Sequence, residues 1–171
     1  MSVARPPGPP LAASGWRWLP LTAAVIGADQ LVKAWVVHHF GLFERVHVLP
    51  VLDLILTYNT GAAFSFLAGA AGWQRWVFIG LALAVSVVLI AWLRRLHAAR
   101  ERLLAAALAL IAGGALGNML DRLLHGRVVD FVHVHWQQHY FPAFNVADSA
   151  ITVGAALLLL DAWRESRHRP S

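Results

Sequence analysis

Four long apolar runs dominate the pattern of hydrophobic and polar positions along the chain. They cover about residues 18–38, 73–93, 103–123 and 145–163. A helix needs about 20 mainly apolar residues to cross a bilayer, and each run reaches that length. In the fourth run the purely apolar part, residues 151–160, is long enough only if residues 144–150 belong to it. The pattern predicts an all-α membrane fold with four transmembrane helices.

Two connections between these runs have a pattern typical of short strands. Residues 46–58 are rich in Val, Leu, Ile and Thr and contain Pro50, which predicts two strands that turn at this proline. Residues 128–136, VVDFVHVHW, alternate apolar with polar positions, which suits a strand or an interfacial segment. A small β element, a β-rich cradle with an interfacial segment, is therefore expected beside the helices.

Composition supports the membrane interpretation and excludes some chemistry. Hydrophobic residues make up 58% of the 171 positions and charged residues only 13%, which is too apolar for an ordinary soluble domain. The chain has no cysteine, so disulfides and thiol catalysis are excluded. We expect a disordered tail over residues 1–15, one membrane domain over residues 16–165, and a short tail over residues 166–171.

The arginines predict the orientation of the chain, which carries a formal net charge of +5. Basic residues that flank membrane spans gather on the cytoplasmic side, and topology explains these charges better than a nucleic-acid-binding face does. Both termini are expected in the cytoplasm and both strand-rich connections outside it. The arginines on the expected cytoplasmic side are Arg5, Arg17, Arg94, Arg95, Arg100, Arg102, Arg164, Arg167 and Arg169.

Charged residues inside the first run need a partner or a function, because ionisable groups are expensive within a membrane. Asp29 and Lys33 are four residues apart, which places them on one helical face where they can neutralise each other. Two interpretations remain open: an ion pair that stabilises the helix bundle, or a direct part in catalysis.

The third run ends in the string GGALGNMLDR, where small and polar residues share a face. The spacing puts Gly114, Asn118 and Asp121 together, with Arg122 adjacent. Residues 113–117 form a G-x-x-x-G pattern, which favours tight helix packing but does not explain Asn118. Asp121 and Arg122 could form an ion pair with each other at the interface.

The string YNTGAAF in the first outer connection places Asn59 beside Gly61 and two alanines. Small residues permit close backbone approach, and an Asn side chain offers a donor and an acceptor to a bound peptide. An ordinary loop turn uses the same residue types.

Two acids far apart in the sequence are expected at the same outer face of the membrane. Asp130 follows the third run and Asp148 opens the fourth. An aspartic peptidase needs such a pair, with one carboxylate activating water and the other, protonated, polarising the scissile carbonyl. The alternatives are a helix N-cap for Asp148 and a solvated loop acid for Asp130.

Five short motifs in this order resemble lipoprotein signal peptidase, also called signal peptidase II. They are DQLVK at 29–33, YNTGAAF at 58–64, GGALGNMLDR at 113–122, VVDF at 128–131 and FNVADS at 144–149. The resemblance implies an aspartic endopeptidase of the bacterial cytoplasmic (inner) membrane that cuts prolipoproteins before a diacylglyceryl-modified cysteine. Asp130 and Asp148 would be its catalytic pair. Positions expected to bind substrate or support the site are Asp29, Lys33, Asn59, Gly61, Gly114, Asn118, Asp121, Arg122, Asn145 and Ala147.

The resemblance also implies that no metal or other cofactor is needed. His133 and His135 alternate on the expected strand, but the sequence indicates no third ligand for zinc. Expected partners are the lipid-modified precursor proteins and membrane lipid, with no nucleic acid, and the protein is expected to act as a monomer.

Two other function classes compete with a peptidase. A transporter or proton channel would use the acids as a relay, yet such a relay needs acids spread across the membrane depth, whereas most polar residues here gather toward the outer side. A scaffold packed through its glycines would leave the Asn and Asp residues without a purpose.

Overall fold

The computed structural model describes residues 9–61 and 72–168. Two short 3-10 turns, η1 (Leu11–Ala13) and η2 (Gly15–Trp18), precede the first long helix. The elements that follow are α1 (Leu19–His39), β1 (Arg45–Leu49), β2 (Leu52–Asn59), α2 (Gln74–Arg95), α3 (Arg102–His125), β3 (Val128–Trp136), β4 (His139–Tyr140) and α4 (Val146–His168).

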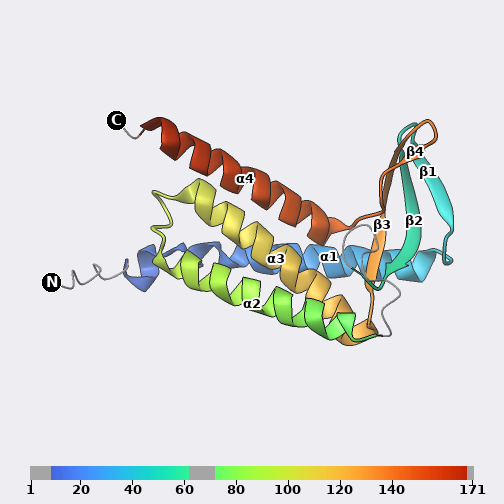
Figure 1. Cartoon of the computed structure of the whole chain (residues 1–171), viewed down its shortest axis with the longest axis horizontal. Helices are drawn as coiled ribbons and strands as arrows, with labels where there is room; N and C mark the ends of the chain where they lie inside the picture. Colours follow the sequence, from blue (N-terminus) through green and yellow to red (C-terminus); the bar gives the residue numbers. More distant parts are fainter. Residues whose placement is uncertain (1–8, 62–71, 169–171) are drawn as a thin grey trace.

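The four long helices confirm the predicted membrane spans, since each is long and apolar enough to cross a bilayer. They lie alongside one another, with the sheet at one end of the bundle (Figure 1). Helix α1 begins and α4 ends at the opposite end. The helices start within one residue of the predicted positions but extend up to five residues further, because the polar residues at their ends remain helical.

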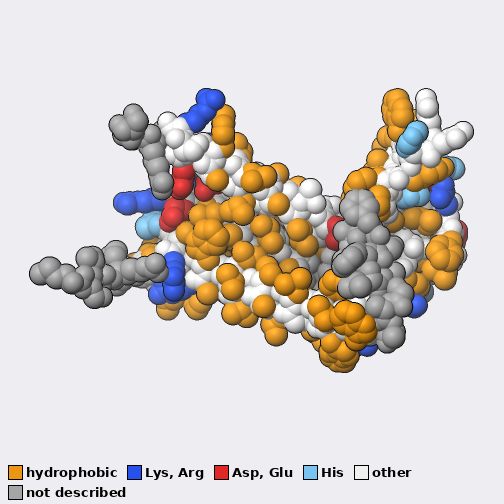
Figure 2. Space-filling view, in the orientation of Figure 1, with side chains coloured by type: hydrophobic (Ala, Val, Ile, Leu, Met, Phe, Trp, Pro, Cys, Tyr) orange, Lys and Arg blue, Asp and Glu red, His pale blue; other side chains and the backbone are white. Residues whose placement is uncertain are grey.

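Helix α3 lies at the centre of the bundle and packs against the other three helices. Half of its most apolar stretch is buried, compared with 11% for α4 and 17% for α2. Hydrophobic side chains cover much of the helical body in the space-filling view (Figure 2). An apolar outer surface on a bundle with a buried central helix suits contact with lipid rather than water.

Glycines allow α3 to approach its neighbours closely, as the G-x-x-x-G pattern predicts. A Cβ atom on Gly113 would lie 2.8 Å from the Val25 Cβ of α1. A Cβ atom on Gly114 would lie 2.3 Å from the Ala147 carbonyl oxygen of α4. The backbone of α4 therefore touches that of α3 at the first turn of α4.

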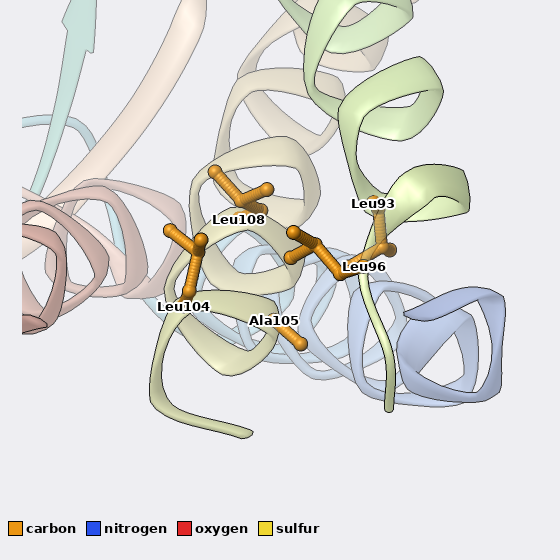
Figure 3. Packing of buried hydrophobic residues seen from close by; sticks show 5 residues of the cluster. All are labelled: Leu93, Leu96, Leu104, Ala105 and Leu108. Atoms are coloured by element: carbon orange, nitrogen blue, oxygen red, sulfur yellow. The ribbon is translucent and has the colours of Figure 1, made fainter. Parts of the chain in front are cut away.

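A cluster of buried leucines joins α2 to α3 at the end of the bundle away from the sheet (Figure 3). Leu93 and Leu96 come from the end of α2 and the residues after it, and Leu104, Ala105 and Leu108 come from the first turns of α3. This packing fixes the connection between the two helices.

The segment before α1 differs from the predicted disordered tail over residues 1–15. Ser14 is fully buried, and the Gly15 backbone N–H donates to the Leu96 carbonyl over 2.8 Å. A Cβ atom on Gly15 would lie 2.3 Å from the Leu93 carbonyl oxygen, so only glycine permits this approach. Residues 9–15 are thus packed against the α2–α3 connection, while residues 1–8 lie outside the described residues.

The strands form an antiparallel sheet in the order β1-β2-β3-β4, which confirms both predicted strand regions. The first hairpin turns at Pro50, and β3 starts after Gly126, whose φ of 75° ends α3 in a left-handed cap. Val36 of α1 packs with Leu56, Val129 and Phe131, which attaches the sheet to the bundle.

We predict that Gly114→Ala destabilises the protein. The new methyl group has to displace the α4 backbone, and overpacking of this kind costs about 1–3 kcal/mol. Thermal unfolding in detergent should show a lower midpoint. The matched control is Gly80→Ala on α2, where no heavy atom lies within 4 Å of the added Cβ and the midpoint should not fall. Equal midpoints for the two variants would contradict the tight α3–α4 contact.

Candidate active site

Main-chain pairing brings the start of α4 next to β3, and with it the two acids Asp130 and Asp148. The Phe144 carbonyl accepts hydrogen bonds from the N–H groups of Phe131 and Val132, and Phe144 donates to the Val132 carbonyl over 3.0 Å. Asn145, the next residue, therefore lies beside Asp130. Both acids line one cleft of about 870 Å³.

Asn145 connects the two acids directly. Its fully buried side chain donates from Nδ2 to Asp130 Oδ1 over 2.7 Å. Its Oδ1 accepts from the Asp148 backbone N–H over 2.9 Å, while its own N–H donates to Asp148 Oδ2 over 3.3 Å. This reciprocal pattern is a capping box in which Asn145 is the N-cap of α4 and Asp148 is its third helical residue. The alternative that Asp148 is itself the N-cap is therefore wrong.

Asp130 is 3% exposed, and its environment favours the neutral acid. Burial and the nearby charge of Asp148 raise the pKa of Asp130 to about 7, against the opposing effect of hydrogen bonds from Asn145 and Asn59. The alternative that Asp130 is a solvated loop acid is therefore wrong. A carboxyl with this pKa can hold a proton near neutral pH and donate it.

Asn118 of α3 supplies a donor to the second acid. Its Nδ2 donates to Asp148 Oδ1 over 2.8 Å. Its Oδ1 accepts from Lys33 Nζ over 3.0 Å and from Asn145 Nδ2 over 3.2 Å. Because an ammonium group can only donate, Lys33 fixes the orientation of this amide with its NH₂ group toward Asp148.

Lys33 of α1 is the centre of a buried ion network. Its Nζ contacts Asp29 Oδ2 at 2.7 Å and Asp121 Oδ2 at 2.9 Å, and all three side chains are at most 4% exposed. Asp121 therefore pairs with Lys33 and not with Arg122, which corrects the alternative considered from the sequence. Neighbouring side chains on a helix point about 100° apart, so Asp121 faces α1 while Arg122 faces the cleft.

Each acid of this network also accepts a backbone N–H next to a cleft acid. Asp29 Oδ1 accepts from Ala147, and Asp121 Oδ2 accepts from Val129, over 2.9 and 3.1 Å. Ala147 thus contributes its main chain, and the Asp29 carboxylate sits favourably at the N-terminus of α4.

Arg122 and Asn59 shape the opposite wall of the cleft. Arg122 donates to the Gly61 carbonyl over 2.7 Å, and its guanidinium lies 5.0 Å above the Phe78 ring. Gly61 in turn donates its N–H to Asn59 Oδ1, which closes a turn at the end of β2. Asn59, Arg122 and both acids line the cleft together.

Gly114 lies one helical turn before Asn118 and packs against Ala147 and Ile151. Its contribution is close helix packing, and it does not line the cleft. The structure thus brings all the other expected positions into one connected network around the two acids.

Sequence reasoning missed two features of this site. Gln30 donates to Asp121 Oδ1 over 2.8 Å and to Asp29 Oδ2 over 3.2 Å, yet its place beside Asp29 gives no spacing cue. The second is the apolar wall of the cleft, formed before and along α4 by Phe141, Pro142, Phe144, Ile151 and Val153. In the sequence these residues are ordinary span and loop positions. Only the packing of β3 beside the start of α4 shows that they line one cleft.

Comparisons with known proteins show the family to which the chain belongs. The sequence model of the family described as signal peptidase (SPase) II matches residues 21–164. The lipoprotein signal peptidase of Pseudomonas putida (strain KT2440) is 53% identical over 154 residues, covering 89% of this chain and 88% of that protein. That of Yersinia enterocolitica is 47% identical over 154 residues, covering 90% of each.

Two solved structures share the fold. A bacterial membrane enzyme determined by the in meso method at 2.3 Å resolution superposes with a TM-score of 0.79 at 25% identity, covering 91% of this chain and 92% of its own. A second bacterial membrane enzyme, at 1.9 Å resolution, gives a TM-score of 0.71 at 26% identity, covering 84% and 90%. With four membrane-spanning helices and these relatives, the chain is a multi-pass membrane peptidase that belongs to the signal peptidase II family.

Proposed function

We propose that this protein removes signal peptides from bacterial prolipoproteins by cutting before a diacylglyceryl-modified cysteine, with Asp130 and Asp148 as the catalytic pair. One observation carries the proposal: acids from β3 and α4 share the Asn145 side chain and line one cleft. Two such carboxyl groups can divide the acid and base roles that amide hydrolysis requires.

The contacts of each acid support a division of these roles. Asp148 receives N–H donors from Asn118 and Asn145, the arrangement that a carboxylate base needs. Asp130, with its pKa raised to about 7, holds the proton. Asp148 takes a proton from water as the water oxygen attacks the carbonyl carbon, and Asp130 donates its proton to the carbonyl oxygen. When the tetrahedral gem-diol intermediate collapses, the C–N bond breaks and Asp148 gives its proton to the leaving amine. Asp130 takes a proton back from one hydroxyl group of the diol, which regenerates both acids in their starting states.

The rest of the cleft suits a substrate that enters from the lipid. Its apolar wall continues along α4, whose outer surface is largely exposed in the bundle. An acyl chain could remain against this wall while the adjacent peptide bond reaches the acids. Asn59 and Arg122, across the cleft, offer polar contacts to the peptide backbone.

Charge distribution supports an orientation with the cleft outside the cytoplasm. Arg94, Arg95 and Arg102 lie at the end of the bundle away from the sheet, where α1 also begins and α4 ends. The positive-inside rule places that end, and both termini, in the cytoplasm of the inner membrane. The sheet and the acids then face outward, where exported precursors arrive. In this proposal the protein acts as a monomer without a metal at the acid pair.

Replacing either acid by Asn should abolish cleavage. Asp130→Asn and Asp148→Asn each remove one half of the proton transfer, so kcat should fall by at least about 10²–10⁴-fold. Substrate affinity should change little because Asn keeps the shape. The assay uses purified protein and a lipidated precursor peptide. Asp161→Asn, in the C-terminal half of α4 and outside the cleft, is the matched control and should retain activity. A single dyad variant that cuts at a near-normal rate would overturn the pair.

Activity should fall as the pH rises through about 7. Above that value Asp130 loses the proton that it must donate, so kcat/KM should decline on the alkaline side.

The stability of the fold should also fall as the pH rises. A carboxyl whose pKa is raised by folding stabilises the folded state fully below the pKa of the unfolded chain. It loses that contribution as the pH rises through the pKa of the folded state. The melting midpoint of the wild type should therefore drop relative to Asp130→Asn as the pH rises from about 4 to about 7. A flat difference across that interval would refute the raised pKa.

Asn118→Ala should slow cleavage without unfolding the protein. The variant loses the hydrogen bond to Asp148, and bonds to charged groups contribute about 1.5–3 kcal/mol, or about 10- to 100-fold in kcat. Steady-state kinetics and the melting midpoint should be measured together. His125→Ala, on the exposed end of the same helix, is the control and should keep the wild-type kcat. Unchanged kcat in Asn118→Ala would remove Asn118 from the catalytic arrangement.

A further inference from the structure

A second polar cluster lies on the sheet, apart from the acid pair. His47 of β1 and Asp53 of β2 are direct cross-strand partners, and His135 of β3 reaches the same carboxylate. His47 Nδ1 lies 2.5 Å and His135 Nε2 lies 3.4 Å from Asp53 Oδ1. Three neighbouring strands thus direct two imidazoles and one carboxylate to a single point.

Several polar atoms of this cluster are buried without a hydrogen bond. Asp53 is fully buried, and its Oδ2 has no hydrogen-bond partner. Both ring nitrogens of His135 are also buried without one, although Nε2 is close to Asp53. Buried polar groups in proteins are normally satisfied. His135 Nε2 faces Asp53 Oδ1 at 3.4 Å without a hydrogen bond, which supports a missing ligand at that point.

The chemistry of these donors selects the ligand. Imidazole nitrogen with one carboxylate oxygen suits zinc, whereas magnesium and calcium prefer all-oxygen sites. Tetrahedral zinc, with bonds of about 2.0–2.1 Å, places its ligand atoms about 3.3 Å apart. The His135–Asp53 separation of 3.4 Å is close to this value, and all three donor atoms lie within 4.8 Å of one another. His47, whose side chain is 75% exposed, is free of the packing that would prevent it from moving outward to the same spacing.

We propose that His47, Asp53 and His135 form a binding site for a zinc ion, with the fourth position open to water. The ion would connect β1, β2 and β3. It would not touch the catalytic acids. Its effect would reach the cleft through the sheet, because His133, the cross-strand partner of Asp53, lines the cleft wall.

Arg45 is the one feature of the described cluster that opposes a cation. Its guanidinium lies 3.6 Å from Asp53 Oδ2, on the oxygen that the two histidines do not contact. Arg45 also stacks over the Tyr140 ring at 5.2 Å, which holds its charge to one side. Removing this charge should therefore strengthen zinc binding, a direction that a purely structural cluster would not produce.

The test is a zinc titration of the full-length protein in detergent, without a polyhistidine tag and after removal of metal. A competing fluorescent chelator reports the affinity, and magnesium serves as the negative cation. One zinc ion should bind per chain. His135→Gln and Asp53→Asn should each weaken binding at least about 10-fold, and Arg45→Gln should strengthen it. His139→Gln, on the exposed β4 strand of the same sheet, is the matched control and should bind zinc as the wild type does.

Hydrogen exchange of the wild type locates the ion without any substitution. Zinc should slow amide exchange in residues 45–59 and 128–136 and leave the four helices unchanged. Absence of saturable zinc binding would overturn the proposal, as would binding that survives both His135→Gln and Asp53→Asn. Neither measurement depends on cleavage, so the zinc site and the peptidase mechanism succeed or fail separately.

Discussion

The buried ammonium group of Lys33 is the interaction on which the site depends. It contacts Asp29 on its own helix, and Asp121 and Asn118 on α3. The two carboxylates each accept a second group, the backbone N–H of Ala147 or of Val129. Those amides belong to the residues that immediately precede Asp148 and Asp130. A single positive charge on α1 therefore helps to position both acids, which belong to β3 and α4.

This arrangement also explains how so many ionisable groups are tolerated in a membrane protein. A charged side chain at the centre of a spanning helix costs about 2.5–3.5 kcal/mol on insertion scales, unless it finds partners. Here every donor of Lys33 has an acceptor, and Gln30 and two backbone amides satisfy the remaining carboxylate oxygens. Breaking one member of such a network typically costs about 3–5 kcal/mol, because the partner is left charged and unpaired. The ion network therefore contributes to the stability of the fold, as does the leucine cluster that joins α2 to α3.

The sequence was sufficient to predict the spans and both strand regions, because length, hydrophobicity and short patterns report those features locally. It also predicted that Asp130 and Asp148 lie at the same place, and both line one cleft. The sequence could not predict the hydrogen-bond or ion-pair partner of each polar residue. Asp121 and Arg122 are adjacent in the chain but face different helices, so proximity suggested an ion pair that does not form. The capping role of Asn145 and the cluster of His47, Asp53 and His135 depend on β pairing between remote segments, including the contact of Phe144 with β3. Residues 9–15 were predicted to be disordered from their composition, which gives no sign that Gly15 packs closely against the Leu93 carbonyl.

The difference between the two acids follows from the orientation of two amides. Lys33 can only donate, so it holds Asn118 with its oxygen inward and its NH₂ group toward Asp148. The N–H of Asp148 holds Asn145 with its oxygen toward α4 and its NH₂ group toward Asp130. Asp148 thus gains a donor from α3 and another from the helix N-terminus, whereas Asp130 lies in a more enclosed position where burial outweighs its amide contacts. Two chemically identical side chains acquire distinct environments because a lysine fixes one amide and a helix start fixes the other.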